Sequence, residues 1–212
     1  MGRVTENKQA KRNSIFHSSF DLFRTKGFFQ TSISDIVTKA GVAKGTFYLY
    51  FKDKYDLRDK LIAYKAGTLF HAAELNLSKT NIKDFSERLI FIADQIIDRL
   101  ALEPDFLKFI SKNLSWGVFK TALLKGHDTG ETDFYNAYLR MVEESPYEFK
   151  NPEIMLFMIV ELVGSSCYSC ILEDEPLPME EYKPYLYDVI RGIIQMQIVR
   201  KKSSKEIIDH RH

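Results

Sequence analysis

Four side chains that can donate hydrogen bonds follow one another closely near the N-terminal quarter of the chain: Lys44, Thr46, Tyr48 and Tyr50. Ammonium and hydroxyl groups are the donors that proteins use toward phosphate oxygens and base edges. Gly45 stands among them, and because it has no side chain the backbone can approach a ligand closely there. The spacing therefore points to contacts with nucleic acid.

Two short helices joined by a tight turn must position these donors. Ser32 and Asp35 form an S-x-x-D pattern that predicts a capped helix start, and Gly41 predicts its end. A second helix is expected from about Lys44 to Phe51. The apolar positions expected to face inward are Ile36, Ala40, Val42, Phe47 and Phe51. Helix, turn and helix at this spacing predict a helix-turn-helix whose second helix enters the major groove.

Lys54 follows directly, where a long helix is expected to begin. Its ammonium and the helix N-terminus are expected to hold one phosphate together.

The segment resembles the DNA-binding signature of the TetR family, and the resemblance covers roughly residues 8–60. The matching positions are Thr31, Ile36, Ala40, Gly41, Val42, Gly45, Thr46, Tyr48, Tyr50, Phe51, Lys54 and Leu57, with Phe23, Gly27 and Phe28 upstream. Two positions depart from the pattern. Val37 replaces a small alanine, and Ala43 replaces the serine that caps the second helix, a loss that costs about 0.5–2 kcal/mol.

The resemblance implies roles for nine residues. It implies phosphate contacts from Lys44, Thr46, Tyr50 and Lys54, close backbone approach at Gly45, Tyr48 at the groove, and backbone contacts from Thr31, Ser32 and Ser34. Two alternatives stay open. Lys44 can instead read guanine O6 and N7, and Tyr48 and Tyr50 can be ordinary half-buried aromatics.

Charge is distributed unevenly along the chain. Residues 1–60 carry twelve Lys and Arg against six Asp and Glu, a net charge of +6, whereas the remaining residues carry 18 against 23, a net charge of −5. A basic head on an acidic body indicates that the head meets a polyanion.

The fold class expected is all-α, with about nine helices. Glycine and proline are sparse, at 10 and 6, and apolar residues recur at helical spacing nearly throughout. We expect a three-helix DNA-binding domain over 1–54 and a helical ligand-binding and dimerisation domain over 55–212. The helices expected after the head cover 54–77, 82–102, a stretch opened by Pro104, 134–144, 152–172 and 182–202.

The resemblance implies a homodimer, formed by the last two helices, on a palindromic operator. These helices are apolar, and Gly164, Ser165, Ser166 and Ser169 permit close packing. It also implies a repressor that a small apolar or amphipathic effector releases from DNA. Candidate pocket residues are Phe91, Phe109, Trp116, Phe119, Tyr138, Phe157, Glu161 and Tyr168, each of which can instead be core. Glu161 can also lie at the dimer interface or on a solvent-exposed side of its helix. The alternative is that the helical domain over 55–212 binds a protein partner and not a small-molecule effector.

Other function classes find little support in the sequence. G-x-S-x-G, phosphate-cradling glycine loops and H-E-x-x-H do not occur, so we expect no enzyme activity and no cofactor. Cys167 and Cys170 have no second pair, and the acidic loop around His127 matches no standard metal site. No secretory signal opens the chain, and Glu161 interrupts the apolar run 154–172. We expect a cytoplasmic protein with a buried bundle helix there.

Overall fold

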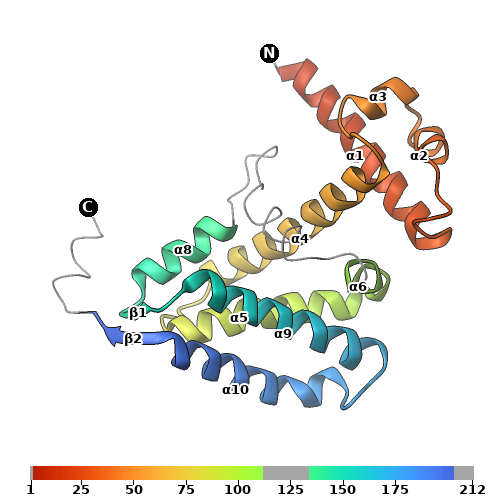
Figure 1. The fold of residues 1–212 in the computed structure, drawn as a ribbon. Helices are drawn as coiled ribbons and strands as arrows, with labels where there is room; N and C mark the ends of the chain where they lie inside the picture. The colour runs from red at the N-terminus through yellow and green to blue at the C-terminus, as the bar shows by residue number, and fades with distance from the viewer. Residues whose placement is uncertain (1, 112–133, 203–212) are drawn as a thin grey trace. The chain divides into compact units, whose positions relative to one another are not determined.

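The computed structural model describes residues 2–111 and 134–202, and these residues form nine helices and one two-stranded sheet (Figure 1). The helices are α1 (Gly2–Thr25), α2 (Ile33–Ala40), α3 (Lys44–Tyr48), α4 (Lys54–Ser78), α5 (Phe85–Leu102), α6 (Pro104–Ser111), α8 (Phe134–Glu144), α9 (Pro152–Leu172) and α10 (Met179–Gln197). The strands are β1 (Tyr147–Phe149) and β2 (Ile198–Lys201). The predicted all-α class is confirmed.

The chain divides into two compact units, residues 1–64 and residues 65–212. We call them the N-terminal unit and the C-terminal unit. Their boundary falls inside α4, ten residues after the sequence-based boundary. The reason is that the first turns of α4 bury Leu57, Leu61 and Ile62 in the small core of the N-terminal unit.

The N-terminal unit is held together by apolar side chains from each of its helices. Ile15, Phe16 and Phe23 of α1 are buried, as are Ile36 of α2 and Phe47 of α3. A helix with one apolar stripe gains most of its stability by burying that stripe against its neighbours. This packing fixes α2 and α3 against α1 and leaves their other faces exposed.

Helices α9 and α10 form the main helical pair of the C-terminal unit, and α9 also packs on α5 and α6. Residues every third or fourth position face inward, among them Met155, Ile159 and Cys167 of α9 and Leu186 and Ile190 of α10. By length and composition alone, α9 is apolar enough to cross a membrane, but a third of its most apolar window is buried in the unit. Such composition also suits a core helix.

A charged cluster joins α10 to α5. Lys183 is nearly buried, and its ammonium lies 2.5 Å from Asp98, 2.8 Å from Glu180 and 3.2 Å from Asp94. Tyr187 donates a further hydrogen bond to Asp94. The three carboxylates raise the pKa of Lys183 above its usual value, although burial opposes that shift. Because the ammonium is surrounded by acceptors, its removal would take the cation away from all three carboxylates.

The C-terminal end of the last helix differs from the prediction. The helix was expected to continue to about Lys202, but it ends at Gln197 and the chain becomes extended at Ile198. There β2 pairs antiparallel with β1, with Phe149 opposite Ile198 and Glu148 opposite Arg200. The β-branched Ile198 and Val199 favour a strand, and the partner strand lies far away in the sequence.

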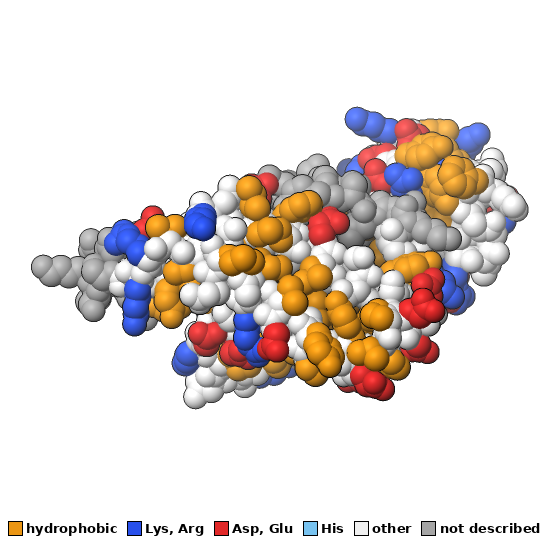
Figure 2. Space-filling model, turned by 60° about the horizontal axis from the view of Figure 1, so that its bottom comes forward, with side chains coloured by type: hydrophobic (Ala, Val, Ile, Leu, Met, Phe, Trp, Pro, Cys, Tyr) orange, Lys and Arg blue, Asp and Glu red, His pale blue; other side chains and the backbone are white. Residues whose placement is uncertain are grey.

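The outer faces of α9 and α10 carry exposed apolar side chains. They are Ile154 and Phe157 on α9 and Tyr185, Val189 and Met196 on α10. Figure 2 shows apolar side chains gathered across the C-terminal unit, with few charges between them. Glu161 lies exposed on the same side of α9 as Phe157, and Gly164 follows one turn later. Scattered exposed apolar residues are ordinary, but a group along two adjacent helices indicates an interaction surface.

Candidate DNA-binding surface

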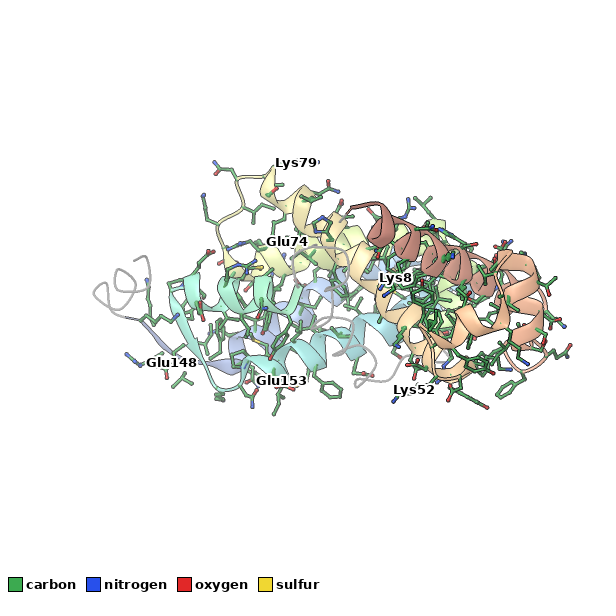
Figure 3. The ribbon with its side chains drawn as sticks, turned by 90° about the horizontal axis from the view of Figure 1, so that it is seen from above. Lys8, Lys52, Glu74, Lys79, Glu148 and Glu153 are labelled. Carbon is green, nitrogen blue, oxygen red and sulfur yellow. The ribbon has the colours of Figure 1, made fainter. Side chains whose placement is uncertain are left out.

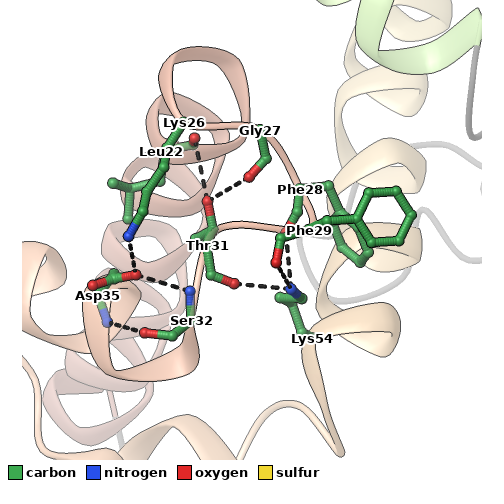
Figure 4. Close-up of polar contacts among 9 residues, drawn as sticks. All are labelled: Leu22, Lys26, Gly27, Phe28, Phe29, Thr31, Ser32, Asp35 and Lys54. Carbon is green, nitrogen blue, oxygen red and sulfur yellow. Dashed lines mark hydrogen bonds and ion pairs between the residues drawn. The ribbon is translucent and has the colours of Figure 1, made fainter.

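Helix α2 starts with the capping box that the sequence predicted. The Ser32 hydroxyl accepts a hydrogen bond from the Asp35 N–H at 3.1 Å, and the Asp35 carboxylate accepts one from the Ser32 N–H at 2.9 Å. The Lys26 ammonium lies 2.7 Å from the same carboxylate (Figure 4). This ammonium, followed by the Ser32 N–H, lowers the pKa of Asp35 to about 2. The start of α2 is therefore tied to the end of α1.

Gly41 ends α2 in the left-handed conformation, with φ of +67°, and its N–H bonds to carbonyls in the last turn of the helix. Glycine adopts this conformation without steric cost, which explains its place in the turn. The Ala40 carbonyl also accepts a bond of 2.9 Å from the Ser14 hydroxyl of α1. The turn is thus fixed from both sides.

Helix α3 is short and buries one face only. It covers five residues, fewer than the eight expected, and the chain continues as a turn to Phe51. Phe47 is fully buried and packs on Phe51 with ring centroids 5.4 Å apart. Ala43 precedes the helix without a side-chain cap, as its substitution for serine predicted.

The opposite face of α3 presents the predicted donors to solvent. Lys44 and Gly45 are exposed, and Tyr48 is 52% exposed. Thr46 and Tyr50 lie at the edge of this face and are half-buried. An added side chain at Gly45 would meet no atom within 4 Å, so the surface is open there. We call Lys44, Gly45, Tyr48 and the flanking Thr46 and Tyr50 the outer face of α3.

Three residues before or on α2 were also predicted to contact the DNA backbone. Ser32 and Ser34 are exposed. Thr31 differs, because its side chain is only 1% exposed and its hydroxyl lies 2.8 Å from the Gly27 carbonyl and 3.3 Å from that of Leu22. The side chain of Thr31 therefore holds the turn between α1 and α2 in the DNA-free chain, and the DNA contact expected of it stays a prediction.

Lys54 also makes an internal contact in the DNA-free chain. Its ammonium donates to the carbonyls of Phe28, Phe29 and Thr31 at 2.8, 3.3 and 2.9 Å (Figure 4). It also lies 4.6 Å from the centre of the Phe28 ring. Lys54 thus bridges α4 and the turn before α2 in the DNA-free chain, and this bridge is the alternative to the predicted phosphate contact. The spacing located Lys54 at the start of α4, but only the fold shows that three carbonyls converge on it.

An aromatic group beside Lys54 was missed by the sequence reading. Phe28 packs edge-on against Phe29 and Tyr55, with ring centroids 5.4 and 5.2 Å apart. The Arg58 guanidinium lies 5.1 Å from the centre of the Phe28 ring. The signal in the sequence for this aromatic group was the pair of adjacent phenylalanines, Phe28 and Phe29, in a predicted turn. The Phe29 side chain is 86% exposed. This group stiffens the support behind α2.

The described candidate pocket residues lie in different environments. Tyr138 is buried, and its hydroxyl donates to the Pro152 carbonyl at 2.7 Å, so it belongs to the core. Phe157 and Glu161 are exposed on the outer face of α9. Phe91, Phe109 and Tyr168 are half-buried, while Trp116, Phe119 and the His127 loop lie outside the described residues. Within the described part of the chain, no cluster of three or more His, Cys, Asp or Glu could hold a metal ion.

Together these features define a helix-turn-helix protein: α2 is fixed at both ends, and α3 presents an exposed face of donors. Residues 15–61 match the family model of bacterial regulatory proteins, tetR family. The fatty acid metabolism regulator protein of Bacillus subtilis is 32% identical over 74 residues. This match spans 35% of the chain and 38% of that relative, so the chain spans less than half of the length of this relative.

Solved structures extend the likeness to the whole fold. A TetR-family transcription regulator from Shewanella sp. PV-4 matches with a TM-score of 0.65 and 16% identity, over 90% of this chain and 99% of that one. FadR from Bacillus subtilis, solved in complex with stearoyl-CoA, matches with a TM-score of 0.59 and 17% identity, over 84% and 96%. Residues 15–61 are thus similar to the DNA-binding segment of tetR-family regulatory proteins, and the described fold is similar to that of TetR-family structures.

Proposed function

We propose that this TetR-family DNA-binding regulator is a repressor that binds a palindromic operator as a dimer and is released by a small apolar or amphipathic effector. The observation that carries the DNA-binding part is the outer face of α3. Its donors are exposed, while the apolar residues of the same helix are buried. Exposed lysine and tyrosine on a helix anchored by its buried face are what a major groove requires.

Charge supports the same surface. The net charge of +6 over residues 1–60 favours a polyanion, and Lys44 places one of these charges on α3. Ser32 and Ser34 add exposed hydroxyls at the start of α2, where the helix N-terminus favours anions. The proposal therefore assigns a base contact to Tyr48, phosphate contacts to Lys44, Thr46 and Tyr50, and backbone contacts to the two serines.

The proposed dimer uses the outer faces of α9 and α10. The exposed apolar residues of these faces would be buried by a second copy of the chain. The surface is open at Gly164 and Gly192, because a Cβ added at either position would meet no atom within 4 Å. Small residues allow helices of a second copy to approach closely, and two-fold symmetry matches a palindromic site. Val189→Asp should shift the chain to monomer in sedimentation, whereas Leu102→Asp, at an exposed position near the end of α5, should not.

The effector proposal rests on the family and on the half-buried aromatics of the C-terminal unit. The related FadR from Bacillus subtilis was solved with stearoyl-CoA, so an acyl-CoA is one effector to test first. The second candidate is a protein that docks on the C-terminal unit. It is favoured by exposed apolar residues there, and it would be supported if that patch stayed open in the dimer.

Selection of bound DNA from a random pool at physiological salt tests the proposed function. Recovery of a palindromic site, lost in Tyr48→Ala and kept in Lys83→Ala, would support it. Lys83 is a suitable control because it is an exposed lysine of the C-terminal unit. Recovery of no preferred sequence by the dimeric protein would contradict it.

A further inference from the structure

One side of α4 holds polar atoms that have no hydrogen-bond partner among residues 2–111 and 134–202. His71 Nδ1 and Glu74 Oε2 are both buried, and neither makes a hydrogen bond. The two residues are three apart in the helix, so their side chains lie on the same side. Figure 3 shows Glu74 in the C-terminal part of α4, which ends near Lys79. Native proteins pair most of their buried polar atoms, so two unpaired atoms on one helix side point to a partner other than the described side chains.

The described neighbours of Glu74 do not supply that partner. Arg140 of α8 lies 3.9 Å from Glu74, but it faces the other carboxylate oxygen, Oε1. By contrast, the Asn76 amide, elsewhere on α4, donates to Gln95 of α5 at 2.9 Å. The packing of α4 thus satisfies its polar groups toward α5 and leaves them unsatisfied beside His71. A buried carboxylate oxygen without a donor is unfavourable, because burial removes its water.

There is room on this side of the helix. Gly67 precedes His71 by four residues, so it lies one turn away on the same side. It is half-buried, and a side chain added there would meet no atom within 4 Å. Open space at a half-buried position is what a bound molecule needs next to the two unpaired atoms.

We infer that Gly67, His71 and Glu74 bind the polar end of an amphipathic effector, and that this end donates N–H or O–H. A carboxylate accepts hydrogen bonds and never donates them, so the group opposite Oε2 must be a donor. An amine fits best, because a hydrogen bond between charged groups is the stronger kind. An ionised carboxylate has no proton to donate to Oε2, and the nearby Arg140 guanidinium already faces Oε1. The inference rests on the proposed effector function and names the chemical class of the effector.

The position of these residues suits a regulatory ligand. They belong to the C-terminal unit, while the first eleven residues of the same helix belong to the N-terminal unit. A molecule bound at Gly67, His71 and Glu74 therefore touches the helix that both units share. A ligand that prefers one arrangement of that helix shifts the population toward it.

The test uses the full chain without DNA and three probes with the same alkyl chain: decylamine, decanol and decanoate, each below its micelle concentration. Binding is measured by calorimetry and by the rise in melting temperature. We expect saturable binding of decylamine, weaker binding of decanol and none of decanoate. Glu74→Gln should weaken decylamine at least about tenfold, the usual loss for a hydrogen bond between charged groups. Glu143→Gln, an exposed position of α8, should leave binding unchanged.

Three results would overturn the inference: decanoate binding as well as decylamine, no saturable binding of decylamine, or unchanged affinity in Glu74→Gln. Gly67→Leu is a second test variant, because the leucine side chain fills the open space and is compatible with the helix. A folded Gly67→Leu protein that still binds decylamine would also reject the site. Operator binding is measured separately, so a chain that binds its operator but no amine rejects only this inference. A chain that binds the amine but no operator rejects only the proposed repressor.

Discussion

Helices α2 and α3 lie next to each other in the chain but are held in different ways. α2 has a capping box at its start, a left-handed glycine at its end and an ion pair to Lys26. α3 has five residues, no side-chain cap, and one buried anchor, Phe47. The difference teaches that α2 is fixed by local hydrogen bonds, whereas α3 is held by a single ring and keeps its outer face free. That division suits a scaffold helix next to a recognition helix.

The largest effect is expected at the anchor of α3. Phe47→Ala removes a fully buried ring, so we expect a loss of about 3–5 kcal/mol of unfolding free energy and loss of DNA binding with it. Chemical denaturation measures the change. Tyr48→Ala is the matched control, because the neighbouring ring is exposed and its removal should change stability by less than about 0.5 kcal/mol. Equal destabilisation by both variants would erase the distinction between the two faces.

The bridge from α4 to the turn before α2 should come next. Lys54→Met keeps the length of the side chain but leaves three carbonyls without their donor, so we expect a loss of about 1–2 kcal/mol. Thermal unfolding of the full chain reports it. Lys52→Met is the control, since Lys52 is exposed in the adjacent turn. A Lys54→Met protein as stable as wild type would show that the bridge contributes nothing.

Two opposite substitutions test the caps of α2 and α3: one removes a cap and the other adds one. Ser32→Ala should cost about 1 kcal/mol, because the Asp35 N–H loses its acceptor, whereas Ala43→Ser should add about 0.5–1 kcal/mol by giving α3 the cap it lacks. The denaturation midpoints of both variants measure these two changes in stability. If Ala43→Ser stabilises the chain but weakens operator binding, looseness at the start of α3 serves recognition.

The smallest effect concerns pH. The pKa of Asp35 is lowered from 3.8 to about 2, so its interactions stabilise the fold above the unfolded value and are lost as pH falls through about 4 to 2. We therefore expect the melting temperature of wild type to exceed that of Asp35→Asn at pH 6, and the gap to close by pH 2. A gap that is constant with pH would show that Asp35 acts as an uncharged cap.

The sequence predicted the local features of this comparison well. Ser32 with Asp35, Gly41 and the uncapped Ala43 are all readable, because capping depends on residues within one turn of each other. The end of helix α8 at Glu144 was also predicted. Of the apolar residues predicted to face inward, Ile36, Phe47 and Phe51 are buried as expected.

The sequence could not show contacts that depend on distant segments. The carbonyls around Lys54 come from residues 23–26 positions earlier, and β2 forms only because β1 lies beside it. Thr31 fits a DNA-contact pattern and a turn-holding role equally, and only its burial decides. The unpaired atoms of His71 and Glu74 likewise emerge from packing, since nothing in the order of residues reveals a missing hydrogen bond.

The central claim is that the outer face of α3 contacts DNA while Lys54 supports it from behind. The salt dependence of operator binding tests it most directly, because each lost phosphate contact lowers the slope of log K against log salt by about 0.9. The account predicts this decrease for Lys44→Met and an unchanged slope for Lys54→Met, whatever the change in affinity. A decrease for Lys54→Met with none for Lys44→Met would contradict it.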